Sequence, residues 1–159
     1  MSMGTQNASG GDGGEEVPGG SGGAVYGARS LRIVAHGNPA AQGSKKHVGN
    51  GRMVEMSKKL PGWRADVEAA ARLAAGPAWV PINAAVSITG EIRLRKPGMT
   101  KYLDHPAGAP DLDKLQRAIG DALTLSRVIA DDARIIHWNI RKVWAENVPG
   151  MDITIQEIA

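Results

Sequence analysis

The sequence predicts an α/β or α+β domain in which a mixed β-sheet is packed with two main helices. Apolar residues recur at helical spacing in residues 62–75 and 112–125. Apolar and polar residues alternate in residues 82–95, 136–144 and 151–155, as expected for strands with one buried face. The predicted order is strand, helix, long strand, helix and three strands, which is typical of helices packed on a sheet.

The first thirty residues are unlike the rest of the chain, because they hold ten of the twenty-one glycines and almost no large apolar side chains. Such a segment cannot bury enough surface to offset the entropy lost on ordering. We therefore predict a disordered tail over residues 1–30 and one folded domain over residues 31–159. The tail carries a net charge of −2, which leaves +5 on the domain.

Several function classes are not expected from this composition. The chain starts without the basic residues and apolar run of a signal peptide, and no stretch is long enough to span a membrane. Cysteine is absent, which excludes disulfides and thiolate metal sites. The four histidines do not have the spacing of zinc ligands. We expect a cytoplasmic protein without a membrane partner.

The domain is expected to begin with a short apolar strand at residues 31–35. A basic, glycine-punctuated segment at residues 42–59 follows, and Gly49-Asn50-Gly51 within it favours a hairpin. The alanine-rich helix over residues 62–75 is stopped by Gly76-Pro77.

The second half of the chain contains the longest predicted strand, residues 82–95, followed by the second helix. Val128-Ile129 then forms a short strand that leads to Asp131-Asp132, and a turn at residues 147–150 separates the last two strands. The buried stripe of the second helix consists of Leu112, Leu115, Ile119 and Leu123.

Four aspartates stand at the two ends of this second helix, in a chain that is otherwise net basic: Asp111, Asp113, Asp131 and Asp132. Two carboxylates about 4 Å apart repel by roughly 1 kcal/mol in water and by roughly 4 kcal/mol at a partly buried site. Mg²⁺ reverses this cost, because it binds hard oxygen ligands and keeps positions open for water and phosphate. Alternatively, the first pair caps the helix and the second pair forms a turn. That reading explains each pair but not their occurrence together.

The reaction that needs such carboxylates is metal-assisted attack of water on a phosphodiester, with a nearby cation to stabilise the developing charge. If the backbone is helical, Asp113 and Arg117 lie one turn apart on the face opposite the leucines. Asp121 continues that row, and for Asp121 we expect no more than a solvated charge.

Lysine and arginine cluster in several segments, which is the electrostatic pattern of proteins that bind a phosphate backbone. A soluble charged surface is the alternative reading. Trp63, Trp138 and Trp144 fall in apolar periodicities, so stacking on single-stranded bases is not predicted. The candidate DNA-binding residues are Lys45, Lys46, Arg52, Arg93, Arg95, Lys96, Lys101 and Lys114. Arg134, Arg141 and Lys142 form a further basic cluster.

The motif Pro110-Asp-Leu-Asp-Lys-Leu-Gln-Arg-Ala-Ile-Gly-Asp-Ala-Leu, followed by a short apolar strand and Asp131-Asp132-Ala-Arg-Ile, closely resembles the signature of the RusA family of Holliday junction resolvases. Gly37-Asn38-Pro39, Gln42-Gly43-Ser44-Lys45 and Trp63-Arg64 are similar to phage members of that family. The resemblance covers about residues 31–158 and leaves out the tail.

The resemblance implies a RusA-like, homodimeric, Mg²⁺-dependent endonuclease, with Mn²⁺ as a possible substitute. Such an enzyme nicks two opposed strands of a four-way junction in DNA recombination and repair. Its partners would be branched double-stranded DNA and a second copy of the chain, without a nucleotide cofactor, in the cytoplasm of a bacterial host if the chain is encoded by a phage or prophage.

The resemblance also implies roles for single residues. Asp111, Asp113, Asp132 and Arg117 would be catalytic, and Asp111, Asp113 and Asp132, with the adjacent Asp131, would hold the metal. Arg117 stands where the family has a lysine. Because arginine is effectively never deprotonated, either its role is electrostatic or the enzyme is slower than its relatives. The alternative is a non-catalytic or degenerate DNA-binding protein whose aspartates only form caps and turns.

A dimer is also expected from the symmetry of the reaction. One carboxylate cluster per chain offers one nick, and a junction with approximate two-fold symmetry is best matched by a dimer. Two short helices need not cover all the apolar surface that the long strand and the tryptophan-bearing strand offer. This predicts that part of that apolar surface forms the dimer interface.

Overall fold

The structure is a computed structural model, and it describes residues 28–43, 45–47, 49–50, 53–55 and 58–159. Most of the predicted tail and the candidate residue Arg52 lie outside the described residues. The end of the predicted tail belongs to the fold, because the first strand starts at Ser30 and Arg29 Nε donates to Glu157 Oε2 over 2.9 Å.

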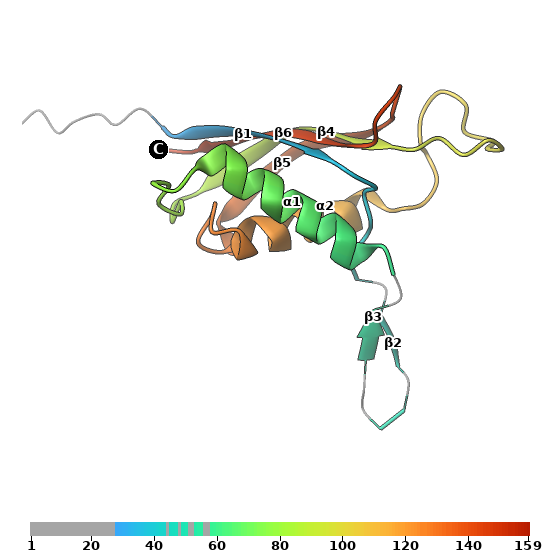
Figure 1. Cartoon of the computed structure of the whole chain (residues 1–159), viewed down its shortest axis with the longest axis horizontal. Helices are drawn as coiled ribbons and strands as arrows, with labels where there is room; N and C mark the ends of the chain where they lie inside the picture. Colours follow the sequence, from blue (N-terminus) through green and yellow to red (C-terminus); the bar gives the residue numbers. More distant parts are fainter. Residues whose placement is uncertain (1–27, 44, 48, 51–52, 56–57) are drawn as a thin grey trace, which may run out of the picture.

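A four-stranded mixed sheet lies at the centre of the domain (Figure 1). Strand β6 runs antiparallel to both of its neighbours, β1 and β4, whereas β4 and β5 are parallel. The predicted mixed sheet is therefore confirmed. Across the sheet the strands are β1 (Ser30–His36), β6 (Gly150–Glu157), β4 (Val86–Leu94) and β5 (Ile135–Trp144).

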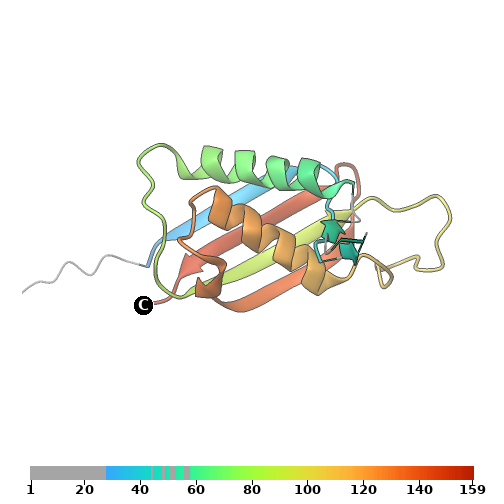
Figure 2. The same ribbon diagram turned by 90° about the horizontal axis from the view of Figure 1, so that it is seen from below.

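Two helices, α1 (Leu60–Ala75) and α2 (Leu112–Leu125), lie side by side on one face of this sheet (Figures 1 and 2). Both were predicted from their apolar spacing. Helix α1 begins two residues earlier than expected, because Pro61 in its first turn lacks only an N–H that has no helical partner at that position. None of the helices in the described part of the chain is long and apolar enough to cross a membrane.

The core fills the space between the helices and the sheet. Trp63 and Val67 of α1 and Leu115 and Ile119 of α2 are buried against Ile88 of β4 and its neighbours. On β4 the buried side chains are at even positions, as the alternation predicted: Val86, Ile88, Ile92 and Leu94.

The predicted start of the long strand and the predicted short strand at Val128-Ile129 are reduced to a single pair of bridging residues. The long strand begins at Val86 rather than at residue 82, and Ile82 instead forms an isolated parallel bridge with Ile129. The Ile82 N–H donates to Val128 O over 3.0 Å, and the Ala130 N–H donates to Ile82 O over 2.9 Å. Apolar alternation cannot distinguish such a bridge from a continuous strand.

The segment between β1 and α1 contains a separate antiparallel pair, β2 (Lys45–His47) and β3 (Met53–Glu55). Gly49 and Asn50 between them have positive φ values of 81° and 49°. The predicted hairpin is confirmed, and it extends away from the sheet (Figure 1).

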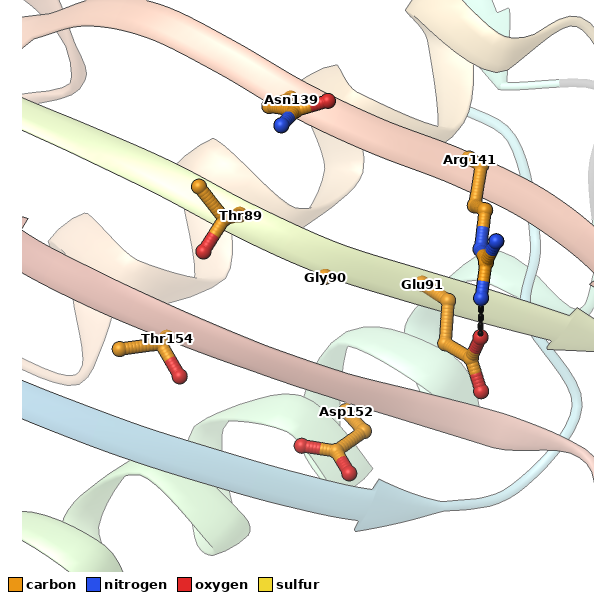
Figure 3. A pocket seen from close by; sticks show the side chains of 7 residues that line it. All are labelled: Thr89, Gly90, Glu91, Asn139, Arg141, Asp152 and Thr154. Carbon is orange, nitrogen blue, oxygen red and sulfur yellow. Dashed lines mark hydrogen bonds and ion pairs between the residues drawn. The ribbon is translucent and has the colours of Figure 1, made fainter.

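The face of the sheet opposite the helices is polar. It has a hollow lined by side chains of β4, β5 and β6, and Arg141 donates to Glu91 there over 3.1 Å (Figure 3). The expectation of surplus apolar surface on the long strand is wrong, because the apolar face of β4 is already covered by α1 and α2. The residues that line this polar hollow are Thr89, Gly90, Glu91, Asn139, Arg141, Asp152 and Thr154.

The start of β5 also departs from the prediction. Ile136 is exposed and Ile135 is half-buried, because the pairing of β4 with β5 shifts register between Val86 and Ser87. From Trp138 onward the alternation is regular.

Candidate active site

The first turn of α2 carries the predicted acidic motif. Asp111 is the extended N-cap residue, and its carbonyl accepts the first helical hydrogen bond from Leu115 N over 3.1 Å. Its side chain makes no capping hydrogen bond, and the carboxylate lies 3.5 Å from Lys114 Nζ. The alternative that Asp111 serves as a side-chain cap therefore does not hold.

The second acidic pair lies in a 3₁₀ helix, η1 (Asp132–Arg134), directly before β5. Asp131 caps this turn, since its Oδ1 accepts from Ala133 N over 2.8 Å. The alternative that the second pair only forms a turn therefore applies to Asp131, but it leaves Asp132 free for another role.

A pocket of about 190 Å³ between α2, η1 and β5 brings three of the predicted catalytic residues together, and we call it the site pocket. Asp113 and Arg117 enter it from α2, and Asp132 enters it from η1. Gly120 lines the pocket between helix and turn, where an added Cβ would lie 3.5 Å from Asp132 Cβ, in ordinary van der Waals contact. The complete lining is Asp113, Gln116, Arg117, Gly120, Asp132, Ile135 and Trp138.

The electrostatics of the site pocket centre on Asp132. Partial burial, and then the nearby carboxylates of Asp121 and Asp131, raise the pKa of Asp132 above its ordinary value. Asp121 was expected to be a solvated charge, but it is half-buried and lies 3.7 Å from Arg64 Nη2. The spacing along α2 could not reveal that Asp121 approaches an aspartate eleven residues later.

The site pocket fits a divalent cation in one respect and is incomplete in another. Asp113 and Asp132 supply two hard oxygen donors, and a cation would relieve the repulsion that Asp132 experiences. Within the described ranges, no group of three or more His, Cys, Asp or Glu side chains forms a metal site. Mg²⁺ does not require such a group, because it is commonly bound by one or two carboxylates plus waters and substrate phosphate.

Arg117 has no ion-pair or hydrogen-bond partner for its side chain in the described part of the chain. Its guanidinium lies against Gly43, where an added Cβ would be 2.9 Å from Arg117 Nη1. Gly43 also has a φ of +104°, which side-chain-bearing residues rarely adopt. Glycine at this position therefore leaves the space that the arginine occupies.

Three residues that support the site were missed as functional residues. The Gln42 N–H donates to Lys114 O over 3.1 Å, and Gln42 Oε1 accepts from Arg64 Nη2 over 2.7 Å. Lys142 Nζ donates to Gly108 O over 2.6 Å and to Pro110 O over 2.8 Å, which fixes the segment immediately before Asp111. All these contacts join residues far apart in the chain. Only the family resemblance, which covered Gln42 and Arg64, gave a signal for two of them.

The candidate DNA-binding residues that the structure describes come from several separate elements. Arg93 projects from the polar face of the sheet, where its Nη1 lies 3.8 Å from Glu91 Oε1. Lys114 lies beside Asp111 at the start of α2. Lys45 and Lys46 lie on β2 of the hairpin.

The remaining candidates lie in the loop between β4 and α2, which extends beyond the end of the sheet (Figures 1 and 2). Lys96 Nζ donates to Leu103 O over 2.7 Å, and Lys101 Nζ lies 5.1 Å from the centre of the Tyr102 ring. The Arg95 side chain is exposed and has no partner among the described residues. Arg134 and Arg141, from the further basic cluster, bind Asn83 and Glu91.

A family model described as Endodeoxyribonuclease RusA matches residues 36–156, a range that includes both walls of the site pocket. No curated protein matches the chain.

Proposed function

Because the chain belongs to the RusA endodeoxyribonuclease family, we propose that it resolves Holliday junctions by paired, Mg²⁺-dependent nicks during DNA recombination and repair. The observation that supports this proposal most directly is the site pocket, which gathers Asp113, Arg117 and Asp132 from two separate elements. These residues combine negative oxygen donors with an unpaired positive charge, as cleavage of a phosphodiester requires.

Asp113 and Asp132 are the residues that would hold the divalent cation. Asp111 stands two residues before Asp113, at the N-cap of α2, and does not line the site pocket. When bound, such an ion polarises phosphate oxygens and lowers the pKa of bound water. The protein contributes by fixing the two carboxylates on different elements, so that the phosphate is held at one place between α2 and η1.

Arg117 is proposed to stabilise negative charge on the phosphate. It lies one helical turn after Asp113, and its guanidinium is not neutralised by another described residue. Because arginine is effectively never deprotonated in proteins, it keeps its positive charge throughout the reaction. Its role is therefore electrostatic, and proton transfer belongs to another group.

We also propose that the active form is a homodimer. One chain has one site pocket and makes one nick, whereas resolution needs two nicks related by the symmetry of the junction. The reason for a dimer lies in the symmetry of the substrate and not in surplus apolar surface, because the free face of the sheet is polar.

The test is cleavage of an end-labelled four-way junction beside a linear duplex of the same sequence, each with Mg²⁺, with Mn²⁺ or with chelator. We expect the protein to cut the junction and to leave the linear duplex intact. This cleavage should occur with Mg²⁺ or Mn²⁺ and not with chelator. The Asp113→Asn variant should bind the junction but leave it intact. Binding without cleavage by the unaltered protein under all metal conditions would favour the non-catalytic alternative.

A further inference from the structure

A second pocket, of about 430 Å³, lies at the edge of the sheet where β4 and β5 end, and we call it the edge pocket. Leu94 and Trp144, the last residues of these strands, form part of its lining. Its other walls come from segments that precede or follow an element: Asn38, Pro39, Lys59, Arg95, Pro97, Ala109 and Pro110.

The edge pocket and the site pocket open on the same face of the sheet. Trp138 lines the site pocket and Trp144 lines the edge pocket. They lie six residues apart on the regularly paired part of β5, so their side chains point to the same face of the sheet. Pro110 in the edge pocket is followed directly by Asp111, and it precedes Asp113 of the site pocket by three residues.

The chemistry of the edge pocket is both apolar and cationic. The Trp144 Nε1 is already bonded to Tyr102 O over 3.0 Å, so the indole offers its ring rather than its donor. Pro39, Pro97 and Pro110 add apolar surface. Lys59 and Arg95 are exposed, and neither side chain has a partner in the described part of the chain.

A nucleotide matches this combination. The base has an apolar face that stacks on aromatic rings, and the edge of the base exchanges hydrogen bonds with a side chain such as Asn38. The phosphates of the nucleotide pair with Lys59 and Arg95. The sequence alone did not predict base stacking, because Trp144 falls within an apolar periodicity. In the structure Trp144 is only half-buried and lines an open pocket.

Distances set where this nucleotide would lie on the DNA. The three residue steps from Pro110 to Asp113 span at most about 11 Å, and the six steps along β5 place Trp144 about 20 Å from Trp138. A DNA strand rises about 3.4 Å per nucleotide. Both measures place the edge pocket within about six nucleotides of a phosphate bound in the site pocket.

We propose that the edge pocket is a nucleotide-binding subsite for the strand being cut. A base within about six nucleotides of the scissile phosphate stacks against Trp144, and Arg95 and Lys59 bind the phosphates beside it. This inference rests on the proposed function, since it assumes that the site pocket holds the scissile phosphate. It would make the edge pocket a determinant of where along the strand the cut falls.

The first experiment measures which single bases of the substrate contribute to binding. Four-way junctions carrying one abasic site, moved stepwise along the cut strand, are titrated with the protein in chelator. We expect one or two positions within six nucleotides of the cut at which loss of the base weakens binding about tenfold. In the Trp144→Leu variant the same abasic sites should have no further effect.

Trp79→Leu is the matched control for this variant. Trp79 is also half-buried with its Nε1 bonded to a backbone carbonyl, Val128 O, but it does not line the edge pocket. It should respond to each abasic site as the unaltered protein does. Equal responses of all three proteins at every position would overturn the subsite.

A second variant keeps the inference testable if Trp144→Leu does not fold. Arg95→Gln should weaken junction binding several-fold, and replacing one phosphate near the cut by an uncharged methylphosphonate should then have no further effect. Arg127→Gln is the control, because Arg127 is an exposed arginine without a side-chain partner among the described residues. If Arg95→Gln behaves like this control on a junction that is still cut, the subsite is refuted and the proposed function stands. An unaltered protein that does not bind the junction refutes both.

Discussion

Arg117 carries a positive charge into the site pocket, and Gly43 leaves the space that its guanidinium occupies. Removing a preorganised group that stabilises transition-state charge commonly costs two to three orders of magnitude in kcat. We expect Arg117→Ala to lower the rate of junction cleavage by roughly 100-fold to 1000-fold, and Arg117→Lys to keep most of it. Single-turnover rates with saturating protein measure this effect separately from binding. A near-normal rate for Arg117→Ala would remove this residue from the chemistry.

The carboxylates around Asp132 predict how the free protein responds to metal. Burial and the charges of Asp121 and Asp131 disfavour ionised Asp132, and a bound cation relieves this cost. A ligand that binds only the folded state raises stability by about 2.7 kcal/mol at a hundred times its Kd. We therefore expect Mg²⁺ to raise the Tm at pH 7, and Asp113→Asn or Asp132→Asn to abolish this increase.

Asp104→Asn is the control for the metal-dependent Tm, because Asp104 is an exposed acid in the loop before α2 and does not line the site pocket. Its Mg²⁺-dependent increase should equal that of the unaltered protein. The same increase in Asp113→Asn and Asp132→Asn would contradict metal binding by these residues.

At the scale of elements, the loop before α2 depends on a contact from β5. Lys142 Nζ binds two carbonyls of this loop, Gly108 O and Pro110 O, at partly buried positions. Leaving such acceptors without a donor costs about 1–3 kcal/mol. We expect Lys142→Met to lower the Tm by several degrees and the cleavage rate by about tenfold, because Asp111 loses its fixed position.

Lys142→Arg should restore part of both losses, since it returns a donor to the same place. Lys58→Met is the control for stability, because Lys58 is exposed and has no side-chain partner among the described residues. Unchanged stability and unchanged rate in Lys142→Met would show that β5 does not position the loop.

The contact between the edge strand β1 and β6 predicts a pH dependence of stability. Arg32 donates to both carboxylate oxygens of Asp152, over 2.9 and 2.6 Å, and this hydrogen bonding holds the pKa of Asp152 below its ordinary value. A lowered carboxyl pKa stabilises the folded state above the unfolded value, about 3.9, and that stability is lost as the pH falls through the folded pKa.

Arg32→Gln should therefore lower the Tm at pH 7, and the difference from the unaltered protein should shrink as the pH falls below about 4. Arg127→Gln, which removes an exposed arginine without an ion-pair partner among the described residues, should show no such convergence. Thermal melts at a series of pH values measure both variants. A difference that stays constant down to pH 2 would contradict the role of Asp152.

The helices show which parts of the fold and site can be read from sequence. Apolar spacing located α1 and α2, and the four-residue interval between Asp113 and Arg117 placed both on one helix face. These are local relations, which helix geometry determines.

The unpredicted features depend on contacts between distant segments. Asp121 approaches Asp132 only because η1 packs beside α2, and Lys142 reaches the loop only because β5 ends beneath it. The edge pocket likewise combines residues between positions 38 and 144, and no interval along the chain indicates that they meet.

At the scale of the whole molecule, the helices, the site pocket and the edge pocket occupy one face of the sheet, and the other face is polar. Under the proposed function, each chain therefore offers one cutting site, on this one face. Resolution by paired nicks requires two such sites on one junction, which is the reason for expecting a dimer.

The most direct test uses a supercoiled plasmid that extrudes a cruciform, because its products count the nicks made in one binding event. Two nicks across the junction give linear plasmid, whereas one nick releases the supercoils and gives a nicked circle. We predict linear product from the unaltered protein with Mg²⁺, and nicked circles when it is mixed with an excess of Asp113→Asn chains. Nicked circles alone from the unaltered protein, or linear product from Asp113→Asn by itself, would contradict a dimeric resolvase that acts through the site pocket.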